Sequence, residues 1–187
     1  MATEKLTHEQ ISRIRLNESE AARSHDRFPL ILILENIRSL YNVGSIFRTA
    51  DALVVEAIYT VGYTPHPPRP EIEKTALGAT RTVPNQHFDT IQEAVAAARD
   101  LGRKIAVLEI ATESRSIFEM TPDDFPLALI IGNEITGVSA TSLELSDIAL
   151  EIPMLGSKHS LNVAVATGVA LFECLRVVNP KGTNSQT

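Results

Sequence analysis

The sequence has 187 residues, one cysteine, no tryptophan and no apolar run that approaches the length of a membrane-spanning helix. The single cysteine, Cys174, excludes an internal disulfide framework and a cysteine cluster for zinc, and it is typical of a protein from a reducing cytosol. Its place in an apolar segment predicts a small, buried side chain. The first residues, MATEKLTHEQISRIR, contain no apolar signal core. We therefore expect a soluble, cytoplasmic protein without a membrane partner.

Several familiar site motifs are also missing. No G-x-G-x-x-G follows the first apolar run, so neither a dinucleotide-binding fold nor the commoner Gly-rich methyltransferase fold is indicated. The sequence has no P-loop, no H-E-x-x-H and no paired Cys/His spacing, and we therefore predict no metal site. His159 and Ser160 are adjacent, but GSKHSLN is not a nucleophile elbow, and spacing alone assembles no catalytic triad.

Positive charge is scarce as well. The formal net charge of −6 argues against indiscriminate binding to a polyanion, because non-specific nucleic-acid affinity comes mainly from phosphate neutralisation. The charge is uneven, however. The segment through Arg48 has seven Lys/Arg and six Asp/Glu, a net charge of +1, so the rest of the chain carries −7. A nucleic-acid partner should therefore meet the amino-terminal third.

Short apolar runs rich in Ile, Val and Leu recur along the chain, namely PLILILE, EAIYTVGY, KIAVLEI, PLALIIG and IALEIPM. Such runs are typical of strands that are buried on both faces. Helical segments alternate with them. The clearest, DTIQEAVAAARDLG, has Asp89 as its candidate N-cap and Gly102 as its candidate stop. The alternation predicts an α/β fold with a mostly parallel sheet flanked by helices.

The amino-terminal segment precedes the first predicted strand. Residues 7–24 begin with a T-x-x-Q capping-box pattern and carry two isoleucines at helical spacing, so we expect one short amphipathic helix outside the sheet. We expect residues 1–28 to form this helical extension, residues 29–179 the main domain and residues 180–187 a flexible tail.

Two later segments each leave more than one interpretation open. The loop TPHPPRPEIEK, residues 64–74, has four prolines that hold it extended and exclude regular structure, so it is either a stiff connector or a lid that contacts substrate. The last long helix, SLNVAVATGVALFECLRVV, is apolar nearly all the way round. It packs inside the subunit, against a partner subunit, or both. The apolar side chains in excess of what one sheet face covers include Val165, Val169, Phe172 and Leu175.

Three polar segments each follow directly after an apolar run: NIRSLYNVGSIFRTADA, IIGNEITGVS and IPMLGSKHSLNVAVA. Ligands of α/β proteins bind at the carboxyl edge of the parallel strands, and these segments share that edge, so they can converge on one site. For the first segment, a helix cap at Asn42 is the alternative. That alternative leaves Arg38 and Arg48 unexplained.

In this order, the three segments resemble the motifs of the SpoU family of RNA ribose methyltransferases, within the SPOUT superfamily, and the resemblance runs from about Leu30 to Leu175. The matched residues are Asn42, Gly44, Arg48, Thr49 and Ala50, then Gly132, Glu134 and Gly137, then Ile152, Pro153, Met154, Ser160, Leu161 and Asn162. The resemblance implies a carboxyl-terminal trefoil knot, a homodimer, and S-adenosylmethionine (SAM) as cofactor. The knot runs against the rule that chains are not threaded, so only the resemblance supports it.

The resemblance also assigns residues to a site. It implies a cofactor cradle of Leu108, Glu109, Gly132, Asn133, Ile152, Met154, Ser160 and Leu161. It implies a catalytic set of Arg48, Asn42, Glu134, Ser160 and Asn162. A guanidinium has a pKa above about 12 and no lone pair to offer, so we expect Arg48 to bind a phosphate or a developing oxyanion and not to act as the base. The structural alternatives are an Arg48–Asp51 ion pair, a surface arginine, and a purely loop-stabilising role for Glu134.

The expected partner is structured RNA, and the expected reaction is methyl transfer to a ribose 2′-hydroxyl. The candidate RNA-binding residues are Arg13, Arg15, Arg23, Arg38, Arg69 and Lys74. Many family members that act on ribosomal RNA carry an added amino-terminal RNA-binding domain, which we do not expect here, so transfer RNA is slightly favoured. The alternatives are a non-catalytic RNA-binding or assembly protein of the same fold and a SAM-dependent enzyme that methylates a small molecule.

Overall fold

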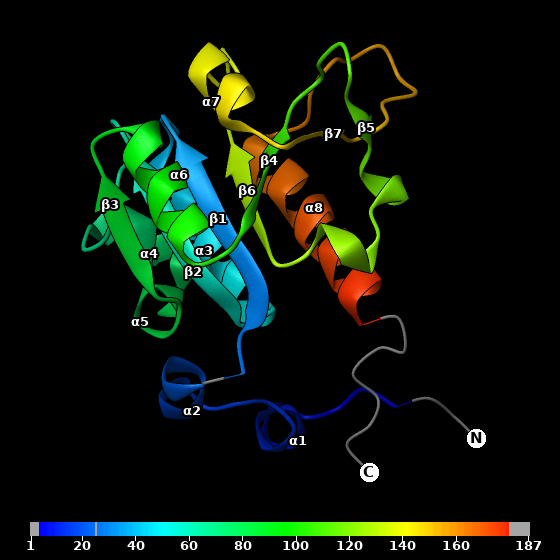
Figure 1. Cartoon of the computed structure of the whole chain (residues 1–187). Helices are drawn as coiled ribbons and strands as arrows, with labels where there is room; N and C mark the ends of the chain where they lie inside the picture. The colour runs from blue at the N-terminus through cyan, green and yellow to red at the C-terminus, as the bar shows by residue number, and fades with distance from the viewer. Residues whose placement is uncertain (1–3, 25, 180–187) are drawn as a thin grey trace.

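The computed structural model describes residues 4–24 and 26–179, so the predicted tail, residues 180–187, lies outside the described residues. Within these ranges the chain forms one sheet of seven strands in the order β3-β2-β1-β6-β4-β7-β5, and every neighbouring pair is parallel (Figure 1). The strands are β1 (Phe28–Glu35), β2 (Val55–Val61), β3 (Asn85–Phe88), β4 (Lys104–Leu108), β5 (Arg115–Ser116), β6 (Leu127–Ile131) and β7 (Ile148–Glu151).

Helices flank this sheet on both faces, which confirms the predicted α/β architecture. The α-helices are α1 (His8–Arg13), α2 (Glu18–Arg23), α3 (Leu40–Ala52), α4 (Pro70–Ala76), α5 (Ala79–Thr82), α6 (Ile91–Asp100), α7 (Ala140–Leu145) and α8 (Val163–Val178). Two short 3-10 helices, η1 (Ile117–Glu119) and η2 (Pro122–Asp124), precede β6. In the described part of the chain, no helix is long and apolar enough to cross a membrane.

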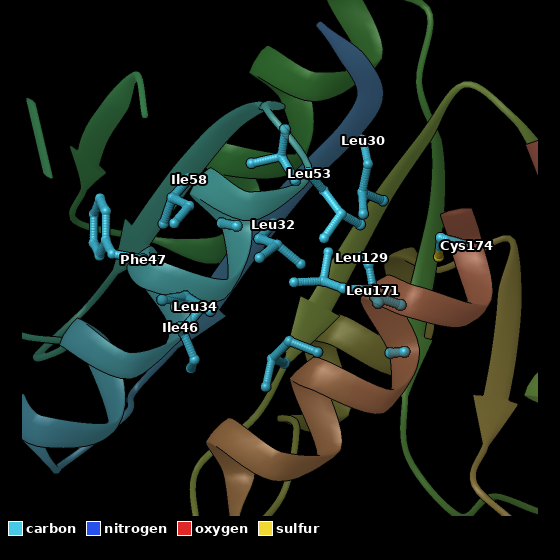
Figure 2. Close-up of a cluster of buried hydrophobic side chains, with 14 of the residues drawn as sticks. Leu30, Leu32, Leu34, Ile46, Phe47, Leu53, Ile58, Leu129, Leu171 and Cys174 are labelled. Atoms are coloured by element: carbon cyan, nitrogen blue, oxygen red, sulfur yellow. The ribbon is translucent and has the colours of Figure 1, made fainter. Parts of the chain in front are cut away.

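The side chains of β1 alternate between two hydrophobic clusters, one on each face of the sheet. Leu30, Leu32 and Leu34 belong to the cluster covered by α3, α4, α5 and α8. Ile31 and Ile33 belong to the cluster covered by α6 and α7. This alternation follows from the two-residue period of a strand, and it explains why β1 is a continuous apolar run. Figure 2 shows the first cluster, in which side chains from β1, α3, β6 and α8 meet.

The helices on the first face approach one another closely at α3. A Cβ on Gly44 of α3 would lie 2.1 Å from the hydroxyl oxygen of Thr75 and 2.3 Å from the carbonyl oxygen of Ile72, both on α4. Glycine at this position is therefore required for α4 to pack against α3. α8 also packs along α3, where a Cβ on Gly168 would be in ordinary contact with Thr49 at 4.0 Å.

The amino-terminal extension contains two short helices instead of the single helix expected over residues 7–24. Asn17 interrupts the helix because it has an extended backbone and caps α2 with a capping box of its own. Arg27 ties α2 to the main domain by donating to the carbonyl oxygens of Ala21 and Thr82 at 2.8 and 3.2 Å. Both helices lie near the amino end of β1, at the edge of the sheet away from the strand arrowheads (Figure 1).

Other local features were predicted only in part. Gly102 ends α6 with φ +73°, as expected, but the N-cap is Thr90 and not Asp89, because the Thr90 side chain accepts the N–H of Glu93 in a capping box. The proline-rich loop becomes helical at Pro70, the first residue of α4, where a missing N–H leaves no hydrogen bond unmade. β3 and β5 were not predicted, because β3 is short and mostly polar and β5 has only two residues.

Candidate active site

A cavity of about 450 Å³ opens at the carboxyl ends of β6, β4 and β7, which are neighbours in the sheet. Its size lies in the usual range for small-molecule sites, about 300–1,000 Å³. Every residue predicted for the cofactor cradle lines it, namely Leu108, Glu109, Gly132, Asn133, Ile152, Met154, Ser160 and Leu161. The second and third polar segments therefore converge on this edge, as expected for parallel strands.

The loop after β6 closes tightly on itself beside the cavity. The backbone N–H and C=O of Asn133 pair with those of Gly137 at 2.9 and 3.0 Å. A Cβ on Gly132 would lie 2.2 Å from the Gly137 backbone. Gly137 has φ +67°, and a Cβ there would lie 2.0 Å from the Glu109 carboxylate. Both glycines of the G-x-E-x-x-G motif are therefore required by the geometry of this loop.

Two of the predicted cradle residues hold this loop with their side chains. Through Oδ1, Asn133 accepts the N–H groups of Ile135 and Thr136 at 2.8 and 3.0 Å. Glu109 accepts the N–H of Val138 at 3.1 Å. These side chains line the cavity and also fix the backbone that forms its wall.

Glu134 joins the three motifs. Its carboxylate accepts the N–H groups of Arg38 and Ser39 at the start of α3, at 2.9 and 3.1 Å. It also accepts the Asn42 amide N–H at 3.0 Å. The Oδ1 atom of Asn42 accepts an N–H from Asn162 at 3.3 Å, and Asn162 is the N-cap of α8. One chain of hydrogen bonds therefore links all three motifs.

The cap of α3 is Ser39, whose hydroxyl accepts the N–H of Asn42 at 3.2 Å. The alternative that Asn42 is itself the helix cap is therefore wrong. Because Ser39 serves that role, the Asn42 side chain is free to bridge Glu134 and Asn162.

The Glu134 carboxyl has a perturbed pKa. Burial acts to raise this pKa, but hydrogen bonds from the backbone of Arg38, its own N–H, the Asn42 amide and the backbone of Ser39 outweigh burial and hold it below the ordinary value of 4.5. The carboxylate is therefore ionised at neutral pH, and its negative charge lies at the N-terminus of α3, where the helix dipole favours an anion.

Arg48 lies apart from the cavity in a single chain. It is exposed on α3, six residues beyond Asn42, which is about 9 Å along the helix axis at about 1.5 Å per residue. It does not belong to the described residues that line the cavity. Over the described ranges Arg48 forms no ion pair, and Asp51 instead accepts a hydrogen bond from Thr82, so the Arg48–Asp51 alternative is wrong.

An exposed apolar stripe lies on α8, which packs against α3, the helix that carries Arg48. The most exposed members of this stripe are Val165 and Phe172, which are 53% and 54% exposed. Together with Val169 they occupy helical positions i, i+4 and i+7, and thus one face of α8. Because α8 meets α3 at Thr49, this face borders the surface that carries Arg48.

The candidate RNA-binding residues fall into two groups. The first lies just before α3, which carries the first motif, and at α4, which packs against α3, and its members are Arg38, Arg69 and Lys74, all exposed. The second lies on the amino-terminal extension at the opposite edge of the sheet (Figure 1), and its members are Arg13, Arg15 and Arg23. A single chain therefore does not bring the second group to the cavity.

Comparison with known proteins identifies the family. The profile of the SpoU rRNA Methylase family matches residues 29–172, which is most of the chain. The chain belongs to the SpoU family. This SpoU protein is 33% identical over 165 residues to the 23S rRNA (guanosine-2′-O-)-methyltransferase RlmB of Ralstonia nicotianae. The match covers 87% of the chain but 65% of RlmB, so the chain spans slightly less than two thirds of that relative.

Solved SpoU structures share this fold. The TrmH/SpoU tRNA modifying enzyme of A. aeolicus superimposes with a TM-score of 0.76 at 30% identity, covering 88% of this chain and 82% of that one. The AdoMet-bound rRNA methyltransferase of Sinorhizobium meliloti gives a TM-score of 0.73 at 28% identity, covering 79% and 56%. The predicted family and fold are confirmed. The trefoil knot is what membership of the family implies for the carboxyl-terminal segment.

The cavity of this SpoU protein fits SAM. Leu108, Ile152 and Met154 supply apolar surface of the kind that suits an adenine ring. Glu109 and Glu151 also line the cavity, and acidic residues suit a positively charged sulfonium. The tight glycine loop forms part of the cavity wall, and its close packing requires glycine because a Cβ on Gly132 or Gly137 would clash with the loop backbone or with Glu109.

Other polar residues meet at this edge that no motif of the sequence predicts. Glu35, buried at the end of β1, accepts the Ser142 hydroxyl at 2.7 Å and so holds α7. The Asn133 amide donates both to the Asn36 carbonyl oxygen at 2.7 Å and to the Tyr63 hydroxyl at 2.8 Å. The second apolar run, EAIYTVGY, ends in Gly62 and Tyr63, and a glycine at the end of a strand pattern is the signal of a turn that points to Tyr63.

Proposed function

We propose that this SpoU protein is a SAM-dependent methyltransferase that transfers a methyl group to a ribose 2′-hydroxyl of structured RNA, and that it prefers transfer RNA. The observation that carries this proposal is the hydrogen-bond chain from Glu134 through Asn42 to Asn162, which holds the three motifs together beside a cavity that fits SAM. A protein of this fold that had lost the chemistry is expected to have lost motif residues, and every matched position is present.

The names of relatives support the reaction and the substrate class. RlmB is a 2′-O-methyltransferase of guanosine in 23S rRNA, and the S. meliloti enzyme was solved with AdoMet bound. The A. aeolicus structure is a tRNA modifying enzyme, and its match covers the largest share of both chains among these three relatives. That fuller match favours transfer RNA over ribosomal RNA.

Bound SAM supplies a methyl group on a sulfonium, and the chain supplies position and charge. Holding reactants in line can contribute about 7–11 kcal/mol to lowering the barrier. Ser160 hydrogen-bonds substrate or cofactor at the cavity, and Asn42 and Asn162 orient the ribose. Arg48 binds the adjacent phosphate or the developing oxyanion with its planar fork of donors, while a phosphate oxygen or water accepts the hydroxyl proton.

We further propose a homodimer in which Arg48 of one chain serves the cavity of its partner. Arg48 does not line the cavity of its own chain, so the site is incomplete in one copy. The apolar stripe of Val165, Val169 and Phe172 borders the surface of Arg48, and pairing this stripe with a second copy removes it from water. The same association would bring the two chains' cavities and arginines together.

Incubating the purified protein with methyl-labelled SAM and unfractionated transfer or ribosomal RNA tests the proposal. Digestion to nucleosides should recover label as 2′-O-methylnucleosides from transfer RNA. Label in ribosomal RNA alone would correct the substrate. RNA binding without label would indicate a non-catalytic protein. If a parallel incubation with a cell extract puts label only into small molecules, the protein is instead an enzyme that methylates a small molecule. The Arg48→Ala protein is the control for contaminating methyltransferases.

A further inference from the structure

Tyr63 is an exposed aromatic side chain whose position is fixed. It is 62% exposed, although it lies beside the loop that forms the cavity wall. Its hydroxyl accepts a hydrogen bond from the Asn133 amide at 2.8 Å, and its backbone N–H donates to Oδ1 of Asn36 at 3.3 Å. The ring is therefore held at both its backbone and its hydroxyl end while most of its surface faces solvent.

The turn that carries Tyr63 is anchored to the sheet. The buried Thr64 hydroxyl donates to the Leu34 carbonyl oxygen at 2.8 Å and accepts the N–H of Ile37 at 3.0 Å. Gly62 has φ +63°, and a Cβ there would lie 2.3 Å from Oδ1 of Asn36. The turn therefore leaves no room for a side chain at Gly62, and the Tyr63 ring is presented from a rigid base.

The surroundings of Tyr63 connect it to the candidate active site. Asn133, which holds the Tyr63 hydroxyl, lines the cavity and anchors the loop after β6. The next residue, Glu134, binds the backbone N–H of Arg38, whose side chain is exposed. An exposed ring and an exposed cation thus flank the same two residues at the rim of the cavity.

We propose that Tyr63 binds the RNA substrate by stacking on a nucleobase next to the methylated ribose, with Arg38 at an adjoining phosphate. The inference rests on the proposed RNA methyltransferase function and identifies a side chain of that site that binds the RNA substrate. RNA is recognised mainly through unstacked bases that stack on aromatic side chains. A ring that is already immobilised loses little conformational freedom on binding, so the geometry favours this role.

Two substitutions at Tyr63 separate stacking from the hydroxyl contact. Tyr63→Leu removes the ring, whereas Tyr63→Phe keeps the ring and removes the hydrogen bond to Asn133. We expect Tyr63→Leu to weaken binding of unfractionated transfer RNA by about tenfold to a hundredfold, the usual effect of losing one base–aromatic stack. The RNA affinity of Tyr63→Phe should stay within about threefold of that of the original protein. Phe118→Leu, which removes another exposed ring (57% exposed) away from the cavity, should leave RNA affinity unchanged.

Calorimetry with SAM reports whether the loop after β6 stays intact. The inference is supported if Tyr63→Leu loses RNA affinity while its SAM affinity stays within about threefold of the original. It is overturned if Tyr63→Leu binds RNA normally, or if both Tyr63 variants lose RNA and SAM affinity equally, because the hydroxyl contact alone would then explain the loss. If the unmodified protein methylates no RNA but Tyr63→Leu still weakens RNA binding, the proposed function fails and the stacking contact stands.

Discussion

Within the three motifs, the glycines and the polar residues have different structural roles. Gly44, Gly132 and Gly137 are needed because helix α4 or a neighbouring backbone or carboxylate occupies the space of a Cβ. Asn42 and Glu134 are needed because they form a hydrogen bond with each other, and because Glu134 also accepts the backbone N–H groups at the start of α3. The motifs therefore combine residues that shape the backbone with residues that join the motifs to one another by hydrogen bonds.

Substitutions of Arg48 test its role at the ribose. Arg48→Ala should lower the rate of methyl transfer by at least about a hundredfold, the usual effect of losing a donor to a developing oxyanion. Its SAM affinity, measured by calorimetry, should stay within a few-fold because the proposed role of Arg48 is at the ribose and not in the cofactor cradle. Arg48→Lys should also be poor, since a point charge does not reproduce a planar fork. A fully active lysine variant would rule out the bidentate contact.

The Glu134 carboxyl should give a measurable pH dependence of stability. A carboxyl whose folded-state pKa is depressed stabilises the protein above its unfolded pKa, and this contribution is lost as the pH falls through the folded value. At neutral pH, Glu134→Gln should lower the free energy of unfolding by about 1 kcal/mol, the usual net size of a lost hydrogen bond. In urea unfolding, the difference between the two proteins should shrink once the pH falls below 4.5.

Glu144→Gln provides a matched control for that experiment. Glu144 is an exposed carboxylate on α7, and its replacement should change stability little. A difference between Glu134→Gln and the original protein that stays constant down to strongly acidic pH would contradict the assigned cause.

At the scale of whole elements, the packing of α8 on most of its sides accounts for its almost entirely apolar sequence. Asn162 caps it, Leu171 and Cys174 face the sheet, and Gly168 lies against α3. Only the side that carries Val165 and Phe172 is exposed. The predicted burial of Cys174 in an apolar helix is confirmed. The helix packs inside the subunit on most sides, and Leu175, which we expected to be in excess, also packs against the core. Packing of the uncovered side against a partner subunit stays a prediction.

Cys174 reports on the integrity of this packing. Burial, aided by the charge of Glu173, raises the pKa of its thiol to about 12, so it is protonated and enclosed at neutral pH. We expect a thiol reagent such as dithionitrobenzoate to react with native protein far more slowly than with urea-unfolded protein. Rapid reaction of the native protein would show that α8 separates readily from the sheet.

For the whole molecule, the apolar stripe on α8 should control both assembly and activity. Phe172→Glu places a charge on this stripe, and burying an unpaired charge at an interface is strongly unfavourable. We expect this variant to sediment as a monomer at micromolar concentration and to lose methyl transfer, because Arg48 is then separated from the partner's cavity. Leu101→Glu, at a similarly exposed position (51%) after α6, should stay dimeric. A fully active monomer would disprove the shared site.

Substitutions of the amino-terminal arginines test whether the amino-terminal extension contacts RNA. Arg13 pairs with Glu9 at 2.5 Å, but both side chains are more than 70% exposed, so the pair adds little to stability and reversing the charge should not unfold the chain. If a dimer brings this extension near the RNA, Arg13→Glu or Arg23→Glu should weaken RNA binding and reduce its salt dependence by about one ion per lost phosphate contact. Unchanged RNA affinity would remove the extension from the binding surface.

The sequence by itself determined the parallel α/β sheet and the edge at which its polar segments meet. Continuous apolar runs specify strands buried on both faces, and the carboxyl ends of such strands share an edge. The resemblance to the SpoU motifs, and not the pattern, assigned Gly132 and Ile152 to a cofactor cradle at that edge. Local pattern also located Gly102 as the stop of α6, because its left-handed backbone favours glycine.

Tertiary structure decided the contacts between segments far apart in the chain. Whether Asn42 caps a helix or bridges two motifs depends on Glu134, which lies 92 residues away and is invisible to local spacing. The separation of Arg48 from the cavity and the fixed position of Tyr63 likewise depend on how α3 and the turn after β2 pack. Periodicity encodes which face of an element is buried, but the partner of an individual polar side chain is fixed only when distant elements come together.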